Sequence, residues 1–273
     1  MESESPPELP DCEWTKADLS QLKIQIVDVD TETFFGTNNL PQSSNIDEDI
    51  VDNPRRPEGP DISVQSKRFF AYLEEALIPP DQYPYESCTV DLFSFLLSDV
   101  FGYELPDGAL HTTHVYIPFV AGGDRVFAKP YLRIVKGPKY CRQHCLVLEA
   151  QERSTLSDDP EPRLLADGIA SFYEDRRRLE KSGEQPMTES KIVPGIIIHG
   201  TAPIFYKILV TKELLDAAEN GEVSVHETLV QRYTPVVPDP QHYLDAGMVP
   251  LTNRRAILTC LEAFKRFVVE KAL

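Results

Sequence analysis

The sequence predicts a single αβ domain in which a mixed central sheet is flanked by helices. Three observations favour this fold class. Hydrophobic residues make up 41% of the 273 residues, which is enough to bury a core. The spacing of apolar residues changes between helical and alternating periods along the chain. The predicted order is a helix, three strands, a helix, two strands and further helices, which favours a mixed sheet.

Two helical segments are predicted ahead of the first strand. Residues 66–78 (SKRFFAYLEEALI) carry apolar side chains at helical spacing, and Pro79 and Pro80 end the pattern. Residues 89–100 (TVDLFSFLLSDV) are apolar around most of a helix, so we expect this helix to be buried on most sides.

Three strands are predicted next. Residues 112–120 (TTHVYIPFV) are β-branched and aromatic, and they end at a predicted turn over 121–124. Residues 125–135 (RVFAKPYLRIV) alternate, and Pro130 implies an edge position or a bulge. Residues 144–151 (HCLVLEAQ) form a short apolar run, as expected of a central strand. We expect 125–135 to pair with 144–151 in one sheet.

A helix that packs across this sheet is predicted after Asp158, Asp159 and Pro160. Its buried stripe consists of Leu164, Leu165, Ile169, Phe172 and Tyr173. The remaining predicted elements are strands at 192–199 and 204–210, a helix at 212–220 capped by Thr211 and stopped at Gly221, and a long helix at 252–271.

The first part of the chain has a different composition. Residues 1–60 are rich in Asp, Glu, Pro, Ser and Asn, which favours a flexible acidic arm. Its one apolar island, residues 22–29 (LKIQIVDV), alternates and predicts a short edge strand or a strand added to a partner's sheet. The predicted organisation is therefore an N-terminal arm over 1–60 and one αβ domain over 61–273.

Charge and composition limit the classes of partner. The formal net charge of −17 disfavours nucleic acid, because phosphate backbones are bound through Lys and Arg. No eighteen apolar residues run together, so no membrane span is predicted. The acidic, proline-rich start fits neither a secretory signal nor a transit peptide, and we expect a cytoplasmic or nuclear protein. Five scattered cysteines argue against a disulfide framework.

Several stretches carry a resemblance to a known family. They are residues 90–97 (VDLFSFLL), 145–151 (CLVLEAQ), 158–172 (DDPEPRLLADGIASF), 194–211 (PGIIIHGTAPIFYKILVT) and 247–268 (GMVPLTNRRAILTCLEAFKRFV). With these stretches the chain resembles a fungal, basidiomycete-type family of PD-(D/E)XK nuclease-like proteins. The resemblance implies a restriction-endonuclease-like core with the order helix, three strands, helix, strand.

The resemblance also implies where a metal site should lie. In the superfamily, acids on the second and third core strands hold a divalent metal, and a Lys two residues after the second acid assists the attacking water. The third-strand motif falls on residues 149–151, where Glu149 is present and Gln151 replaces the Lys. The second-strand acid falls near Tyr131, and residues 125–135 contain no acid. We therefore expect an eroded site and assign no metal ligand.

Strand alternation predicts the surroundings of that site. Lys129, Tyr131 and Arg133 share one face of their predicted strand, and Glu149 and Gln151 share one face of theirs. If the two faces meet, one carboxylate lies beside two cations and a phenol. Such a cluster favours an anion or a polar small molecule over Mg²⁺, which prefers acid-rich oxygen sites. The alternative is that Glu149 simply pairs with Lys129 or Arg133.

Three functions stay open from the sequence. The first is a non-cleaving protein without a cofactor, which binds an unknown small molecule or protein in the old cleft. The second is an enzyme repurposed for a small organic molecule, with His199 as a candidate base. The third is a Mg²⁺- or Mn²⁺-dependent nuclease with migrated residues, in which Lys129 replaces the Lys and Asp91 or Asp124 supplies a ligand. Lys207 is a further candidate ligand-binding residue.

Overall fold

A computed structural model of the chain describes most of its residues. The described residues are 10–42, 46–78, 87–104, 109–137, 142–151, 159–183 and 189–269. The predicted helix stop at Pro79 and Pro80 lies outside these ranges, as do Asp158 and the last two residues of the final predicted helix.

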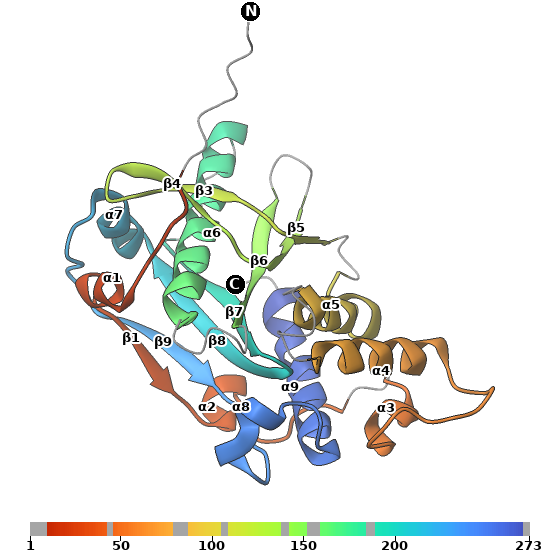
Figure 1. Cartoon of the computed structure of the whole chain (residues 1–273). Coiled ribbons are helices and arrows are strands. Elements are labelled where there is room, and N and C mark those ends of the chain that lie inside the picture. The colour runs from red at the N-terminus through yellow and green to blue at the C-terminus, as the bar shows by residue number, and fades with distance from the viewer. Residues whose placement is uncertain are drawn as a thin grey trace, which may run out of the picture.

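A seven-stranded mixed sheet runs through the molecule in the order β1-β9-β8-β7-β6-β5-β2 (Figure 1). Its strands are β1 (Ile24–Asp28), β2 (Leu110–Thr113), β5 (Leu132–Lys136), β6 (Gln143–Gln151), β7 (Ser190–His199), β8 (Ala202–Thr211) and β9 (Thr228–Tyr233). The pairs β1–β9 and β6–β7 are parallel, and the other neighbours are antiparallel. The predicted mixed central sheet is confirmed.

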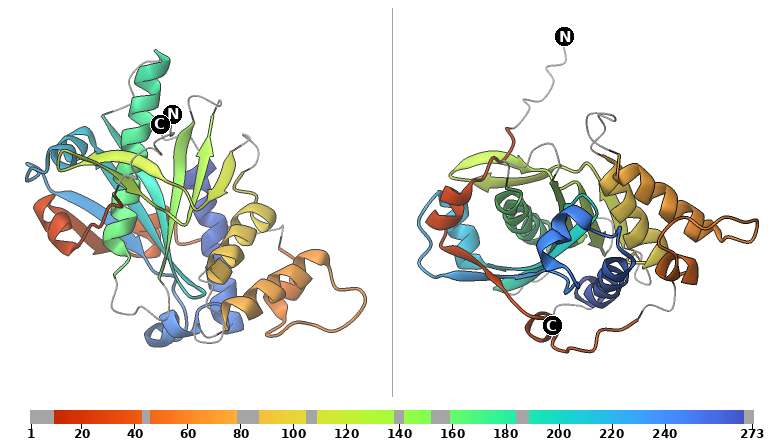
Figure 2. Two further views of the ribbon diagram at one scale, coloured as in Figure 1. Left: turned by 45° about the horizontal axis from the view of Figure 1, so that its top comes forward. Right: turned by 60° about the horizontal axis from the view of Figure 1, so that its bottom comes forward.

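Helices cover both faces of this sheet (Figure 2). They are α1 (Lys16–Gln21), α2 (Thr31–Phe35), α3 (Glu48–Asp52), α4 (Val64–Ala76), α5 (Ser87–Phe95), α6 (Glu161–Ser182), α7 (Lys212–Asn220), α8 (Tyr243–Ala246) and α9 (Leu251–Val269). A π-helical turn, Leu96–Val100, continues α5, and a 3-10 turn, Pro240–His242, precedes α8. One apolar core joins α2, α4, α5 and α9 to the sheet, and a second joins α1, α6 and α7 to its other face.

The predicted helices and strands of the second half are confirmed within a few residues at each end. Thr211 caps α7 by accepting a hydrogen bond from the Leu214 N–H, and α7 ends at Gly221, whose φ of 67° suits glycine. The predicted stripe of α6 is buried at Leu164, Ile169 and Phe172, although almost every residue of the helix between 162 and 175 is also buried.

Two glycines allow α6 to lie close to the sheet. A Cβ atom on Gly195 of β7 would lie 3.1 Å from both Leu164 Cδ2 and Ile208 Cδ1. A Cβ atom on Gly168 of α6 would lie 3.1 Å from Ile208 Cδ1. Because the interior is already close-packed, a side chain at either position would force the helix and the sheet apart.

The outer side of α6 is covered by a second, two-stranded sheet, which explains why the helix is buried nearly all round. This sheet is the hairpin β3 (Ile117–Ala121) and β4 (Asp124–Ala128), which turns at Gly122 and Gly123 as predicted. Phe119 and Val126 of the hairpin pack in one cluster with Ala170 of α6. Figure 1 shows the hairpin passing across α6.

This hairpin corrects two of the predicted strands. Residues 112–120 are two strands, β2 and β3, which belong to different sheets and are separated at His114, where φ is 51°. Residues 125–135 are likewise β4 and β5, separated around Pro130, which has no N–H to continue a ladder. The predicted pairing with β6 is confirmed for β5 alone.

The structure also differs from the predicted acidic arm over 1–60. The predicted edge strand is present as β1, but it lies beside β9 (228–233), a strand that the sequence analysis missed. Phe34, Phe35 and Ile50 are fully buried in the core. Arg254 at the start of α9 donates hydrogen bonds to the carbonyls of Ile50 and Asn53. A few apolar residues therefore fix 10–42 and 46–60 to the domain, despite their acidic composition.

Across the described stretches, no helix combines the length and the apolar character that crossing a bilayer would require.

Candidate functional site

The candidate site is centred on Glu149, in the middle of β6. Leu148 and Ala150 point into the core on the α9 side, so alternation turns Val147 and Glu149 toward α6. The Glu149 side chain is only 2% exposed. A carboxylate at such a position is costly unless neighbouring groups compensate its charge.

Asp167 of α6 meets Glu149 on this face. Asp167 is also 2% exposed, and its carboxyl group forms hydrogen bonds with the Glu149 side chain and with the Lys129 backbone N–H. Burial raises the pKa of Asp167 well above its usual range, and the negative charge of Glu149 raises it further. Two buried carboxyl groups in contact repel each other when both are ionised, so the site favours the protonated form of Asp167 beside a charged Glu149.

One oxygen of this pair has no partner. Oδ2 of Asp167 is buried from solvent and forms no hydrogen bond with any residue that the structure describes. Buried polar atoms are nearly always hydrogen-bonded, so an exception of this kind indicates a functional role or a missing bound group.

Two cations border the acid pair. Arg163 lies one helical turn before Asp167, and its Nε lies 3.3 Å from Glu149 Oε2. The Lys129 ammonium lies 2.5 Å from Asp11 Oδ1 and 4.8 Å from the centre of the Tyr116 ring. Each cation thus has an acidic partner at the site.

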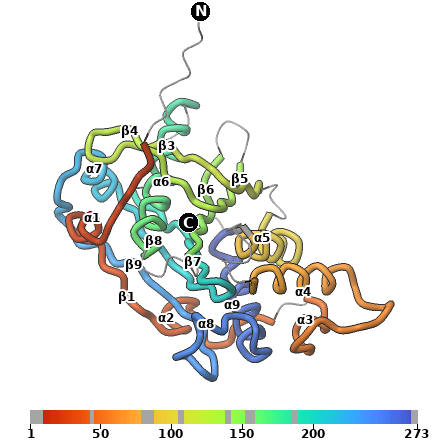
Figure 3. The backbone as a smooth tube through the Cα atoms, in the orientation of Figure 1, coloured from red at the N-terminus to blue at the C-terminus, as the bar shows by residue number. Residues whose placement is uncertain are grey.

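The acid pair opens into a cavity of about 460 Å³. Its lining residues are Asp11, Cys12, Glu13, Trp14, Thr15, Phe127, Ala128, Lys129, Glu149, Arg163, Ala166 and Asp167. One wall is the segment before α1, which runs along β4 through a Cys12 N–H bond to the Phe127 carbonyl (2.8 Å) and a Phe127 N–H bond to the Pro10 carbonyl (3.0 Å). Figure 3 shows this segment reaching the hairpin.

Cys12, in this wall, is not an activated nucleophile. Burial raises the pKa of the Cys12 thiol to about 12. Since the thiolate is the nucleophilic form, this thiol is inert near neutral pH.

Two further candidate residues lie on the same face of the sheet. Gln151 follows Glu149 at the end of β6, and it is opposite His199 in the parallel β6–β7 ladder. Burial lowers the pKa of His199 against the opposing effect of Glu161 and Asp159, so its imidazole is neutral near pH 7.

The structure separates other candidates from this site. Tyr131 lies in the irregular segment between β4 and β5 and packs against the core on the opposite face of the sheet. Asp91 belongs to α5, the helix on that opposite face, and burial raises its pKa. Asp124 begins β4 at the hairpin turn. The predicted shared face of residues 129, 131 and 133 was wrong, because the strand breaks at Pro130 and its alternation does not continue.

Arg133 belongs to a separate buried network around Asp175 of α6. The Arg133 guanidinium donates to His144 Nε2 at 2.9 Å, and His144 Nδ1 lies 2.7 Å from Asp175 Oδ1. Lys191 Nζ lies 2.7 Å from Asp175 Oδ2. Burial alone would raise the pKa of Asp175, but Lys191 and His144 outweigh it and lower the pKa.

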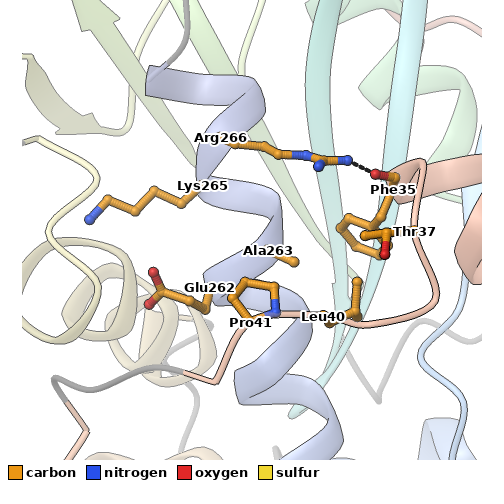
Figure 4. Close-up of a pocket in the computed structure, with 8 residues that line it drawn as sticks. All are labelled: Phe35, Thr37, Leu40, Pro41, Glu262, Ala263, Lys265 and Arg266. Atoms are coloured by element: carbon orange, nitrogen blue, oxygen red, sulfur yellow. Dashed lines mark hydrogen bonds between the residues drawn. The ribbon is translucent and has the colours of Figure 1, made fainter.

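Lys207 lies on the α9 side of the sheet, beside a second pocket. Its ammonium donates to the Phe34 carbonyl and lies 4.1 Å from the centre of the Phe267 ring. Burial, with a contribution from Arg266, lowers the pKa of Lys207 to about 8. Arg266 in turn donates to the Phe35 carbonyl (Figure 4). These cations hold the C-terminal end of α2, where free carbonyls favour positive charge.

The pocket in Figure 4 has a volume of about 350 Å³ and lies between α9 and the segment after α2. Its lining residues are Phe35, Thr37, Leu40, Pro41, Glu262, Ala263, Lys265 and Arg266. The acid pair of Glu149 and Asp167 is on the other face of the sheet, so this pocket is separate from the candidate site.

A serine–histidine–glutamate cluster connects β2 to α5. Ser94 Oγ lies 2.9 Å from His111 Nε2, and His111 Nδ1 lies 3.2 Å from Glu104 Oε1. Nucleophilic catalysis needs this order of groups. Ser94, however, lies inside α5, where the backbone N–H groups bond to carbonyls one turn earlier and are unavailable to an oxyanion. We therefore infer that these contacts hold the edge strand β2 against α5.

The sequence analysis missed Asp167, Arg163 and the wall formed by residues 11–15. A signal for Asp167 was present, because it is an acid placed between Leu164 and Ile169 in the apolar stripe of α6. An acid in such a stripe must be paired or protonated. The wall had no signal, since acidic composition gave no reason to expect residues 11–15 beside the sheet.

The donor set does not suit the divalent metal that the resemblance implied. Within the described ranges, no three His, Cys, Asp or Glu side chains gather in a group that could hold a metal ion. The two acids at the site are buried against each other, burial and Glu149 raise the pKa of Asp167, and Arg163 contacts Glu149. No family model and no curated protein matches this chain.

Proposed function

We propose that this chain is a PD-(D/E)XK nuclease-like protein with an eroded metal site, and that it binds a small polar ligand without cleaving phosphodiesters. The element order α5, β2, β5, β6, α6, β7 supports the nuclease-like core. So do the antiparallel β5–β6 pair and the parallel β6–β7 pair joined through α6. In this interpretation the β3–β4 hairpin is an insertion between the first and second core strands.

The observation that carries the proposal is the compensated charge of the acid pair. Asp167 is buried against Glu149, which together with burial raises the pKa of Asp167, and the Glu149 carboxylate is paired with Arg163. A divalent ion would have to ionise a buried acid beside another carboxylate and also displace a guanidinium. Mg²⁺ dehydrates reluctantly and favours sites that supply negative oxygen ligands, so this arrangement opposes its binding.

The cavity itself supports a ligand-binding role. A volume of about 460 Å³ falls within the roughly 300–1,000 Å³ of small-molecule sites. It combines aromatic walls with a few polar groups at its base, which is the usual composition of such sites. The proposal requires no feature of the cleft other than this cavity.

A migrated nuclease is the second candidate, and one contact favours it. Asp167 supplies a second acid beside Glu149, and Lys129 lines the same cavity. These residues differ from Asp91 and Asp124, the migrated ligands that the sequence suggested. The same pair also suits the repurposed enzyme, since a protonated acid next to a carboxylate can give and take a proton.

Metal titration and cleavage assays distinguish these candidates. Wild-type protein is titrated calorimetrically with MnCl₂ and with MgCl₂ at pH 7, and it is incubated with single- and double-stranded DNA and RNA in the presence of each metal. We expect no saturable metal binding below the millimolar range and no cleavage.

Variants make the outcome specific to the acid pair. Glu149→Gln removes its one negative charge, and Asp216→Asn removes an exposed acid on α7 as the matched control. Micromolar Mn²⁺ binding, together with cleavage that Glu149→Gln abolishes and Asp216→Asn keeps, would establish the migrated nuclease and overturn our proposal.

A further inference from the structure

A group of arginines gathers at one end of the main sheet, outside the candidate site. Its members are Arg133 of β5, Arg142 just before β6, and Arg177 and Arg178 near the end of α6. Arg178 reaches from the helix to the start of β6, where its Nη1 donates to the Arg142 carbonyl at 3.4 Å. In Figure 1 the last turns of α6 and the adjoining ends of β5 and β6 lie at the same end of the molecule.

Arg133 is partly buried and has only uncharged hydrogen-bond partners. Its Nε donates to Thr112 Oγ1 at 3.2 Å, and its Nη1 donates to His144 Nε2 at 2.9 Å. Burial, together with the positive charge of Arg178, lowers the pKa of Arg133 to about 10 against the opposing effect of two nearby acids. The guanidinium is therefore still charged at pH 7, and a partly buried charge without an ion-pair partner is costly.

The two acids in this region are engaged by other cations. Glu174 accepts from Arg177 at 3.2 Å and from Arg178 at 2.8 Å. Asp175 forms an ion pair with Lys191 at 2.7 Å. With the other two arginines included, five cationic side chains stand beside two carboxylates. The region therefore has an excess of positive charge.

The sequence explains this local excess. Residues 125–148 contain no Asp or Glu, although the chain has 44 of them, and the same run contains six Lys or Arg residues. The rest of the chain is strongly acidic, with a net charge of −17 for the whole. Such a charge repels a long polyanion at long range, so the region suits a small anion better than a nucleic acid.

Several N–H groups of these arginines are available to a ligand. The Arg142 side chain forms no hydrogen bond or ion pair with any residue that the structure describes. The Nη2 groups of Arg133 and Arg178 likewise have no partner in the described ranges, and neither is buried from solvent. Guanidinium groups match the oxygens of a phosphate in geometry as well as in charge.

We propose that Arg133, Arg142 and Arg178 form a binding site for a doubly charged phosphoryl group, which is either free phosphate or the phosphate of a small monoester. The open N–H groups of the three side chains donate to the phosphoryl oxygens. The two negative charges of the ligand offset the local excess of positive charge. This site is separate from the cavity at Glu149, and it does not depend on the function proposed above.

The test compares anions of similar shape and different charge. Phenyl phosphate carries about two negative charges at pH 7.5, whereas phenyl sulfate carries one. Both, and inorganic phosphate, are titrated calorimetrically into the full-length protein. We expect phenyl phosphate to bind at least about tenfold more tightly than phenyl sulfate, and its affinity to fall as NaCl is added. Inorganic phosphate that binds as tightly as phenyl phosphate identifies free phosphate as the ligand, and weaker binding identifies a monoester; both results support the site.

Variants assign the binding to the arginines. Because Arg142 has no side-chain contact to lose, Arg142→Gln should unfold in urea like wild type and weaken phenyl phosphate binding at least about tenfold. Arg142→Lys keeps the charge without the planar fork, so its affinity should lie between the two. Arg55→Gln removes an exposed arginine between α3 and α4, on the opposite face of the sheet, and should leave binding unchanged. NMR shifts of the Nε–H groups of Arg133 and Arg178 locate the bound probe.

Three outcomes would overturn the phosphoryl site. They are an absence of binding by both phosphates, equal affinity for phenyl sulfate and phenyl phosphate, and equal losses for Arg142→Gln and Arg55→Gln. A single-stranded oligonucleotide that binds more tightly than phenyl phosphate, and that Arg142→Gln weakens, would overturn the small-ligand assignment in favour of nucleic acid. The acid pair takes no part in this site, so these results leave the function proposed for its cavity intact.

Discussion

Two buried aspartates on α6 face the same sheet and differ in almost every other respect. Asp175 has both oxygens engaged, by the His144 backbone N–H, the His144 ring and Lys191. Asp167, about two turns earlier, has one oxygen without a partner. The pKa of Asp175 is lowered by its cationic partner, and the pKa of Asp167 is raised by burial and Glu149. Both aspartates are buried, so the difference between their pKa shifts comes from the side chains that the neighbouring strands place beside them.

Side chains near the starts of the strands compensate the charge of Asp175 but not that of Asp167. His144 and Lys191 stand near the starts of β6 and β7, where their side chains reach Asp175. In the middle of β6 the facing residue is Glu149, a second acid. Because Asp175 has all its partners in the chain itself, we interpret it as structural. Asp167 has no such compensation, because the residue that faces it is itself an acid.

The largest expected effect comes from removing the charge of Asp175. Asp175→Asn leaves Lys191 with only 10% of its side chain exposed and no carboxylate beside it. Breaking a buried pair in this way costs about 3–5 kcal/mol. Urea unfolding at pH 7 should show this loss. Asp167→Asn is the matched comparison, and it should lose at most about 1 kcal/mol, because it removes no ion-pair partner. Equal losses for the two variants would remove the distinction between the two aspartates.

A second variant tests the close packing of α6, which carries both acids, against the sheet. Gly195 lies opposite Val147, between the levels of His144 and Glu149 along β6. Gly195→Ala places a methyl group 3.1 Å from Leu164 and Ile208, and such overpacking costs about 1–3 kcal/mol. Ile208→Val removes one of the contacting methyl groups. The double variant should therefore lose less stability than the sum of the single variants, and additive losses would contradict the contact.

The third prediction concerns pH and has opposite signs for the two acids. The raised pKa of Asp167 gives stability that is present below its usual value of 3.8 and is lost as pH rises toward the folded-state pKa. Asp167→Asn has no such loss, so its unfolding free energy relative to wild type should increase with pH by up to about 1.4 kcal/mol per unit. Urea unfolding from pH 4.5 to pH 8 measures this, and a constant difference would contradict a raised pKa.

For Asp175 the predicted pH dependence of stability has the opposite sign. Its lowered pKa contributes stability above its usual value of 3.8, and that stability is lost as pH falls through the folded-state pKa. Asp175→Asn should therefore show a smaller acid loss than wild type below about pH 4. A steeper loss in the variant would contradict this assignment.

The smallest expected effect is spectroscopic. Burial lowers the pKa of His144 despite the opposing contribution of Asp175. Its ring should therefore remain neutral below its usual pKa of 6.5, with the proton on Nδ1 directed to Asp175 and Nε2 accepting from Arg133. Nitrogen-15 NMR of the imidazole identifies this tautomer, with exposed His242 as the internal reference. A doubly protonated ring at pH 6.5 would show that Asp175 outweighs burial.

The contrast between these acids also explains what the sequence could predict. Strong periodic patterns of apolar residues predicted β6, α6, β7 and β8, because the apolar side chains of these elements pack into the cores on the two faces of the sheet. Glu149 was found because the third-strand motif of the resemblance falls on residues 149–151. Of its predicted neighbours, Lys129 lines the same cavity, whereas Tyr131 and Arg133 lie elsewhere, because Pro130 ends the alternation on which their positions depended. The pairing of Asp167 with Glu149 joins a helix to a strand, and spacing along one element carries no information about such a contact.

Composition alone did not predict how the acidic residues 10–42 and 46–60 pack against the domain. Average composition there is polar, but Phe34, Phe35 and Ile50 are enough to anchor it to α9 and β9. Composition describes the exposed surface of a segment as well as its buried part. A few large buried side chains can therefore decide its placement.

The parallel pairing of β1 with β9 has a consequence for biosynthesis. Asp28 and Arg232, which form two ion-paired contacts across this edge, are 204 residues apart. During translation β1 is made long before its partner strand, so this edge cannot form until most of the domain has been synthesised. The hairpins β7–β8 and β3–β4 can pair much earlier. The wall over the acid pair runs along β4 instead, so it can dock once the β3–β4 hairpin has been made, before the β1–β9 edge forms.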